Sequence, residues 1–213
     1  MQKNNGFIFW GISLVILVLF VWMIVNLATP STKPQIINLD INADDIIKGN
    51  ETAKYTLLEY SDFQCPACAT YQPLVKKLNE EFPNDLKIVF RNFPLSEIHA
   101  NANNAAYAAG AANSQGKFWE MADILFSRQA DWSAEEKPQE KFISYAQELN
   151  LDLEKFKTDM DSTAVKDKVS KDRISAESNN LNSTPTFFVN GQKITNPSSY
   201  NEFKNAIFAD QNK

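Results

Sequence analysis

The chain has 213 residues and very few of the side chains that bind metals or form disulfides. It contains two cysteines, Cys65 and Cys68, and one histidine, His99. A zinc site takes about four ligands, mostly from Cys and His, and this chain is short of them. No cysteine is left over for a second disulfide. We therefore expect no metal and no bound cofactor, and any redox chemistry falls to the two cysteines.

Basic residues are also fewer than acidic ones. Lys3 is the only charged residue among the first 28, and the rest of the chain carries 20 basic and 26 acidic side chains, a formal charge of −6. Nucleic-acid binding depends on basic surfaces that neutralise phosphates. The composition therefore argues against nucleic acid as a partner.

A long run near the N-terminus lacks charge altogether. Phe7–Ala28 is almost entirely apolar or aromatic. A helix of this length, at about 1.5 Å per residue, spans a hydrocarbon core of roughly 30 Å. Trp10 and Trp22 lie towards its two ends, as interfacial aromatics do. We expect an uncleaved transmembrane anchor over residues 7–28, after a short flank, residues 1–6.

A cleaved signal peptide is the rival interpretation of this run. Its apolar region would normally be about 7–15 residues long and end at small residues. Asn26-Leu27-Ala28 matches that pattern poorly, and no cysteine follows closely enough for a lipoprotein. Lys3 on one side and Lys33 on the other give only a weak preference for a cytoplasmic N-terminus.

Residues 29–44 are predicted to be a linker, because they begin with prolines and small polar residues. Residues 45–213 are long enough for one domain with a substantial core. Runs of β-branched, aromatic and aliphatic residues, together with helical apolar spacing, predict a small mixed sheet with helices on its faces and an all-helical insertion at about 97–180. The expected strands are 55–60, 86–90, 186–189 and 192–194, the last two joined by a hairpin at Asn190-Gly191.

The two cysteines stand in the motif Cys65-Pro66-Ala67-Cys68, where the first strand is expected to run into a helix. Proline is well tolerated in a helix's first turn. The N–H groups and dipole at a helix N-terminus stabilise a thiolate. We therefore expect Cys65 to be the nucleophile and Cys68 to resolve the mixed disulfide.

Two further positions are candidates for the site. Glu59 lies on the strand before the motif and, if buried, could exchange a proton with Cys68. The alternative is a solvent-facing acid at a strand end. Thr184-Pro185 precedes a late strand, and because cis X–Pro bonds are a minority in folded proteins, the sequence alone favours trans.

Four ordered blocks resemble the DsbA-like thiol-disulfide oxidoreductases. They are Glu59–Cys68, Phe93-Pro94-Leu95 with His99, Gln115–Met121 and Thr184–Gly191. The likeness covers roughly residues 45 to 210. It implies a thioredoxin fold with an inserted all-helical domain, preceded here by one N-terminal transmembrane helix.

The resemblance also implies roles for single residues. Pro185 would be cis and stand against the disulfide, while Thr184 pairs its backbone with a substrate chain. Phe63 and Pro66 would help form the apolar surface around the cysteines. Glu59 falls on the position of the family's buried acid.

The chain departs from the family at Ala67, where the best-known oxidising members carry a histidine that can stabilise the thiolate. This departure puts the strength of oxidation in doubt. His99 matches a family position at the start of the helical block, and a structural role is expected for it.

The leading hypothesis is a single-pass protein of the plasma membrane whose C-terminal domain is extracytoplasmic, where disulfides persist. It would be an oxidase that introduces disulfides into reduced or misoxidised secreted proteins, and a membrane redox partner would reoxidise it. A reductase or isomerase of the same fold is the alternative. A metal-binding or a peptide-binding, chaperone-like module represents other classes.

Overall fold

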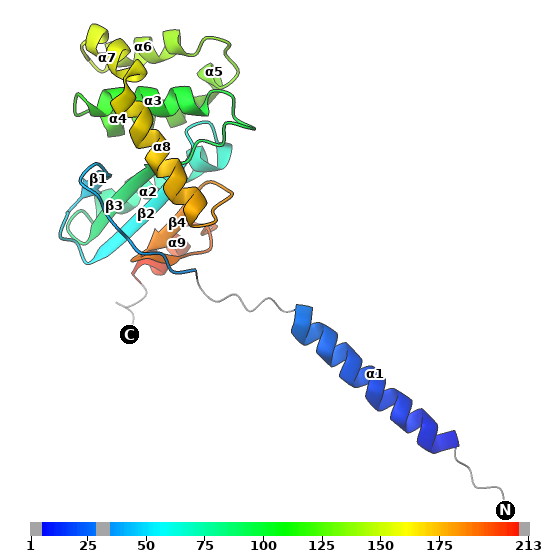
Figure 1. The fold of residues 1–213 in the computed structure, drawn as a ribbon. Coiled ribbons are helices and arrows are strands. Elements are labelled where there is room, and N and C mark those ends of the chain that lie inside the picture. Colours follow the sequence, from blue (N-terminus) through cyan, green and yellow to red (C-terminus); the bar gives the residue numbers. More distant parts are fainter. Residues whose placement is uncertain (1–5, 29–34, 209–213) are drawn as a thin grey trace, which may run out of the picture. The chain divides into compact units, whose positions relative to one another are not determined.

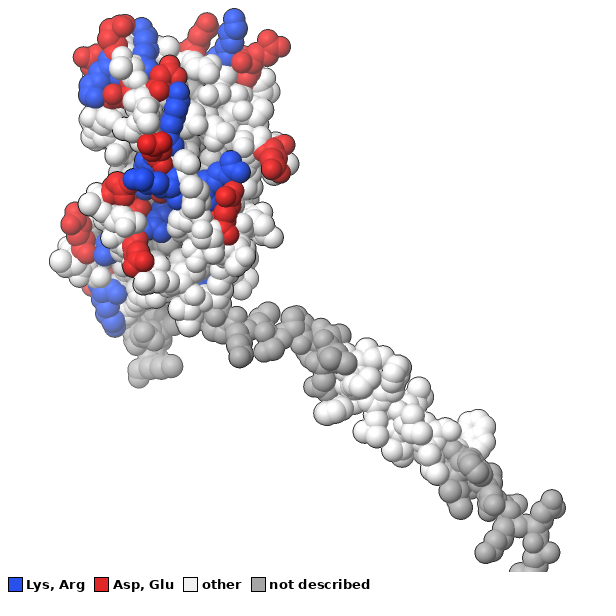
Figure 2. All heavy atoms as spheres, viewed as in Figure 1, with Lys and Arg blue, Asp and Glu red and all other residues white. Residues whose placement is uncertain are grey.

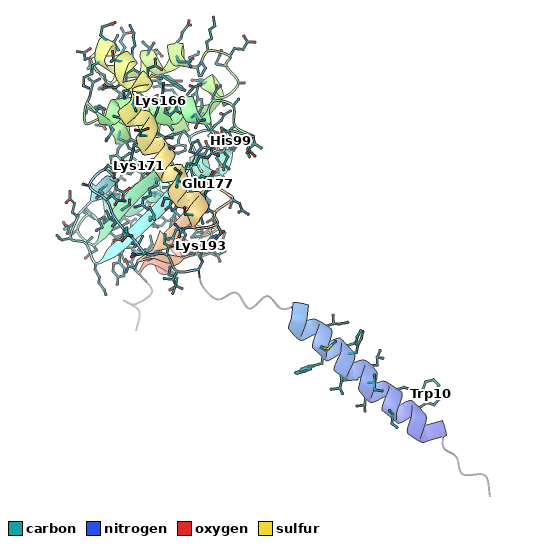
Figure 3. All side chains as sticks on the ribbon, in the orientation of Figure 1. Trp10, His99, Lys166, Lys171, Glu177 and Lys193 are labelled. Carbon is teal, nitrogen blue, oxygen red and sulfur yellow. The ribbon has the colours of Figure 1, made fainter. Side chains whose placement is uncertain are left out.

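The computed structural model describes residues 6–28 and 35–208, without the side chains of residues 6–9, 11 and 25–28. The chain divides into two units, residues 1–34 and residues 35–213. Helix α1 (Gly6–Ala28) belongs to the first unit and is helical where a helix was expected. Its described side chains are uncharged and exposed, and Trp10 is 81% exposed (Figures 2 and 3).

No helix in the described part of the chain combines the length and the apolar character needed to cross a membrane. The transmembrane anchor expected over residues 7–28 is therefore not confirmed. The linker residues 29–34 and the flank residues 1–5 lie outside the described residues.

The second unit is built on one five-stranded sheet with the order β1-β3-β2-β4-β5 (Figure 1). Strands β2 and β3 are parallel, and all other neighbours are antiparallel. The strands are β1 (Ile46–Gly49), β2 (Tyr55–Ser61), β3 (Leu86–Asn92), β4 (Thr186–Val189) and β5 (Gln192–Lys193).

Side chains that alternate along the strands form two separate cores. Leu57 and Phe187 join the core with α2 (Pro66–Glu81) and α9 (Tyr200–Ile207), whereas their neighbours Leu58 and Phe188 join a core with Ala176 of α8 (Thr163–Ser178). Successive residues of a strand point to opposite faces. Helices α2 and α9 therefore cover one face, and α8 crosses the other.

The expected helical insertion is present between β3 and β4. Its other helices are α3 (Ala102–Asn113), α4 (Phe118–Ser127), α5 (Gln129–Trp132), α6 (Gln139–Glu148) and α7 (Leu153–Asp161). Alanines on α3 are buried, which permits close helix packing. A Cβ on Gly110 would lie 2.7 Å from a Val165 side-chain carbon of α8, so a larger residue there would displace the Val165 side chain.

The domain begins earlier than the expected boundary at residue 45. The Ile37 N–H donates to Gly191 O (2.8 Å), and the Lys193 N–H donates to Gln35 O (2.8 Å), so the segment continues the sheet edge beside β5. Ile37 is buried. Residues 35–44 therefore belong to the domain and not to a linker, because apolar side chains among them pack in the core between the sheet and α8.

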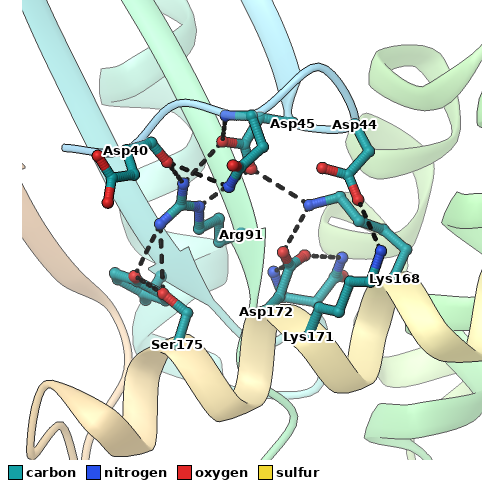
Figure 4. Close-up of polar contacts among 11 residues, drawn as sticks. Asp40, Asp44, Asp45, Arg91, Lys168, Lys171, Asp172 and Ser175 are labelled. Carbon is teal, nitrogen blue, oxygen red and sulfur yellow. Dashed lines mark hydrogen bonds and ion pairs between the residues drawn. The ribbon is translucent and has the colours of Figure 1, made fainter.

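Buried ion pairs and hydrogen bonds hold residues 40–45 against β3 and α8 (Figure 4). The Arg91 guanidinium donates to both carboxylate oxygens of Asp45 (3.0 and 2.7 Å) and to Asp40 O. Lys168 of α8 bridges Asp45 and Asp172. Burial raises the pKa of Asp45, but the hydrogen bonds from Arg91 outweigh it and hold that pKa below its usual value. The cluster joins three elements that are far apart in sequence.

Candidate functional site

The two cysteines lie where β2 turns into α2. Cys65 is the N-cap of the helix, with φ −73° and ψ 121°, and Pro66 occupies the first helical position. Both thiols are free. Cys65 is 7% exposed and Cys68 is fully buried. Cys65 is therefore the more exposed thiol of the pair, as the motif predicts.

The environment separates the acidities of the two thiols. A hydrogen bond from the Cys68 thiol, aided by the backbone N–H groups of Cys68 and Ala67, lowers the pKa of Cys65 to about 5 against the opposing effect of burial. Burial, and the nearby Cys65 sulfur, raise the pKa of Cys68 far above its ordinary value. Near neutral pH, Cys65 is a thiolate and Cys68 a thiol.

Thr184 and Pro185 lie against this pair. The Thr184–Pro185 peptide bond is cis, as the family resemblance implied and in contrast to the expectation from sequence alone. The Cys65 sulfur lies 3.4 Å from the Thr184 carbonyl oxygen, across 119 residues of sequence, and donates to it when protonated. The Thr184 backbone therefore stands beside the reactive sulfur, where a bound polypeptide could reach it.

Glu59 is buried beneath the helix, not solvent-facing. On β2 it is two residues from Leu57, so it points to the same face, towards α2. It is 1% exposed, and its Oε1 has no hydrogen-bond partner. Burial raises the pKa of Glu59 to about 7. Its charge in turn contributes to the raised pKa of Cys68, so the two groups are electrostatically linked.

The structure corrects the expectation for Phe63. Its ring is 1% exposed and packs on Phe90, with ring centroids 5.3 Å apart, so it supports the redox turn from beneath and offers no surface to a substrate. Pro66, by contrast, is exposed as expected. A hollow between α2 and α4, lined by Ala69, Pro73 and Phe126 among others, adds apolar surface near the cysteines.

Polar side chains for which the sequence predicted no role at the site hold the turn before Cys65. Gln129 of α5 donates to the carbonyl oxygens of Phe63 (2.8 Å) and Cys65 (3.1 Å). Gln64 accepts from the Asn101 N–H at 2.7 Å. The Asp62 carboxylate contacts the ring of His99. Asp62 and Gln64 stand inside the block that resembles the family, which was the available signal.

Fold and site together define a class of protein. A free thiol pair at a helix N-terminus, a cis-proline opposite it and a sheet with an inserted helical block are the features of a thiol-disulfide oxidoreductase of thioredoxin fold. The sequence profile of the family described as thioredoxin matches residues 42–209. The chain belongs to the thioredoxin family.

Solved structures agree with this class. BdbD from Bacillus subtilis, in its oxidised form, is 25% identical and superposes with a TM-score of 0.70, over 79% of this chain and 94% of that one. Wolbachia pipientis alpha-DsbA1 is 20% identical, with a TM-score of 0.71, over 79% of this chain and 92% of that one. The expected thioredoxin fold with a helical insertion is confirmed, and so is the enzyme class.

A curated relative has a different name. The Na(+)/H(+) antiporter NhaA 1 of Salinispora arenicola is 36% identical over 161 residues, which are 74% of this chain but only 24% of the antiporter. The chain thus spans about a quarter of the length of the curated relatives it matches. The likeness concerns a domain of those proteins.

Proposed function

We propose that this domain oxidises pairs of thiols in other proteins by thiol-disulfide exchange at Cys65 and Cys68. The observation that carries the proposal is the opposite perturbation of the two thiols, with the pKa of Cys65 lowered to about 5 and that of Cys68 raised. A lowered pKa stabilises the reduced form, because Cys65 is then a stable thiolate. The disulfide form is correspondingly oxidising.

The reaction proceeds in two exchanges. A substrate thiolate attacks Cys65 of the Cys65–Cys68 disulfide, the S–S bond breaks, and Cys68 leaves. Because its pKa is raised, Cys68 needs a proton, and Glu59, with a pKa of about 7, can supply it. A second substrate thiolate then attacks the substrate sulfur and displaces Cys65 as its thiolate. Two electrons pass from the substrate to the cysteine pair.

A substrate chain would lie across Thr184 and Pro185. The Thr184 carbonyl oxygen is 3.4 Å from the Cys65 sulfur, so backbone pairing there would bring a substrate cysteine to the reactive thiol. Pro66 and the hollow between α2 and α4 would contact apolar side chains of the substrate. Reduced or misoxidised secreted proteins fit this description, since they expose both thiols and apolar residues.

The location belongs to the same proposal. An oxidising centre is useful where disulfides persist, which places the domain outside the cytoplasm. The uncharged, exposed surface of α1 supports attachment to a membrane. The naming of a relative as an antiporter, whose ions cross a membrane, also supports a site beside one. A membrane redox partner would return the cysteines to the disulfide form.

A trapping experiment tests the proposal. In the full chain, Cys68→Ser leaves Cys65 as the attacking thiol without a resolving partner. Mixed disulfides with a reduced, unfolded secreted protein should then accumulate. The matched control, Cys65→Ser, keeps only the buried thiol and should trap none. Equal trapping by both variants, or by neither, would refute the assignment of Cys65.

The direction of the reaction needs its own measurement. Equilibrium of the wild-type chain with a glutathione buffer distinguishes an oxidase from a reductase. A potential as reducing as that of thioredoxin, about −270 mV, would replace the oxidase with the reductase or isomerase alternative. Stoichiometric zinc binding by the reduced chain would favour a metal-binding module instead.

A further inference from the structure

Asp62 connects the redox turn to the loop that follows β3. Its backbone N–H points at the Cys68 sulfur (3.5 Å), and its carbonyl oxygen accepts the N–H of Cys65 (3.0 Å). Its carboxylate accepts the backbone N–H groups of Gln64 (2.7 Å) and Leu95 (2.9 Å). The residue is 1% exposed, so these contacts are shielded from water. Asp62 thus contacts the Cys68 sulfur and the Cys65 backbone through its main chain, and Gln64 and Leu95 through its side chain.

His99 completes the environment of that carboxylate. Its ring Nδ1 is 2.7 Å from Asp62 Oδ2, the oxygen that also accepts from Leu95. An ionised carboxylate only accepts hydrogen bonds, so Nδ1 is the donor. His99 lies between β3 and α3, with its side chain 17% exposed, and Figure 3 labels it there. It is the one histidine of the chain.

We propose that His99 is a positioning residue for the redox centre and acts through Asp62. This inference rests on the proposed function and adds a residue to it. The imidazole fixes the orientation of the carboxylate, the carboxylate fixes Gln64 and Leu95, and the Asp62 backbone then holds Cys65 at the helix N-terminus. Without the donor, Oδ2 keeps only its bond from Leu95.

The consequence concerns the thiolate. Backbone N–H groups stabilise the Cys65 anion only while the sulfur is aligned with them, and a relaxed turn would weaken that alignment. Losing the His99 donor should therefore lower the acid ionisation constant of Cys65 about tenfold, which is a rise of one unit in its pKa. For a two-electron couple a tenfold change in the exchange equilibrium is about 30 mV, towards a less oxidising disulfide. A merely structural histidine would change stability and leave both quantities unmoved.

Two nearly isosteric substitutions in the full chain separate the donor from the volume of the side chain. His99→Asn places an amide N–H near the position of Nδ1, and His99→Leu has the same shape without a donor. The pH dependence of thiolate ultraviolet absorbance gives the Cys65 pKa, and glutathione equilibrium gives the potential. We expect the leucine variant to show the shift and the asparagine variant to keep wild-type values. An unshifted leucine variant, or an equal shift in both, would overturn the inference.

Further variants guard against loss of folding. If the leucine variant does not fold, His99→Gln takes its place. It keeps a polar amide but moves its donor one bond beyond Nδ1, so it should show the change in Cys65 pKa and potential that is expected of the leucine variant. Asp172→Asn alters another buried carboxylate that accepts a backbone N–H, that of Asn92 (3.0 Å), and whose hydrogen bonds go to Asn92 and Lys168 and not to the cysteines. It should lower stability without moving the potential. An equal movement in this control would overturn the inference.

The two proposals fail separately. A wild-type chain that does not exchange with glutathione contradicts the proposed function, while the Cys65 pKa of the variants still tests the role of His99. A wild-type chain that exchanges, with variants that match it in pKa and potential, contradicts only the role of His99.

Discussion

Replacing the buried acid Glu59 by glutamine gives a quantitative test of its environment. Glu59 lies on β2 with 1% exposure and an Oε1 that has no hydrogen-bond partner. Burial raises its pKa from 4.5 to about 7. Glutamine keeps the shape of the side chain and removes the ionisation. The variant should therefore differ from the wild type only where the acid would have to ionise.

The direction in which stability changes with pH follows from the number of protons that the folded and unfolded chains bind. Between pH 4.5 and pH 7 the unfolded chain loses the Glu59 proton while the folded chain keeps it, so the stability of the wild type falls as pH rises through this window. Below this pH window Glu59 is protonated in both the folded and the unfolded chain and does not change the unfolding free energy. Above it, the folded state bears a buried charge. The rise of the Glu59 pKa from 4.5 to about 7 corresponds to a loss of about 3 kcal/mol in unfolding free energy.

Urea denaturation of the reduced chain measures this cost. Relative to the wild type, Glu59→Gln should gain about 3 kcal/mol in unfolding free energy at pH 8 compared with its value at pH 4.5. A substitution at an exposed acid, Glu154→Gln, should show no such gain. A pH-independent difference between wild type and Glu59→Gln would refute the argument that burial raises the pKa of this carboxyl.

Two other substitutions probe the scaffold of the site. Asp45→Asn breaks a buried pair whose side chains are 1% and 7% exposed, and because it leaves Arg91 without its counter-charge it should lower the unfolding free energy by about 3–5 kcal/mol in urea denaturation; an unchanged midpoint contradicts this. Gly191→Ala places a Cβ 2.7 Å from the Ile37 carbonyl oxygen at φ +86°, whereas Gly116→Ala meets nothing within 4 Å at φ +72°. The melting temperature of the Gly191 variant should fall further, and equal losses would argue against a clash.

Local patterns were sufficient to predict most of the fold. The aliphatic and aromatic runs of β2 and β4, the hairpin at Asn190-Gly191 and the helical spacing after Cys65 all appear in the structure where expected. Strand β1 was missed because only the first two residues of Ile46–Gly49 are typical of a strand and the segment ends in glycine, whereas β4 of the same length has β-branched or aromatic residues throughout. The short helix α5 was missed because of its length.

Contacts between residues far apart in the sequence could not be predicted from local patterns. The approach of Thr184 to Cys65 spans 119 residues, and that of His99 to Asp62 spans 37, and no periodic pattern encodes either. Resemblance to a family suggested the first, while the second became visible only in the structure. The family resemblance placed Phe63 on the surface, whereas its packing against Phe90, which the sequence does not encode, buries it.

The Cys65 thiolate pKa tests the central claim most directly. The motif lacks a histidine between its cysteines, so the acidity of Cys65 has to come from the Cys68 thiol and the backbone N–H groups at the start of α2. Titration of the reduced chain, followed by thiolate absorbance and checked against Cys65→Ser, should give a pKa of about 5. A value near the ordinary 9.0 would contradict the account of an oxidising centre.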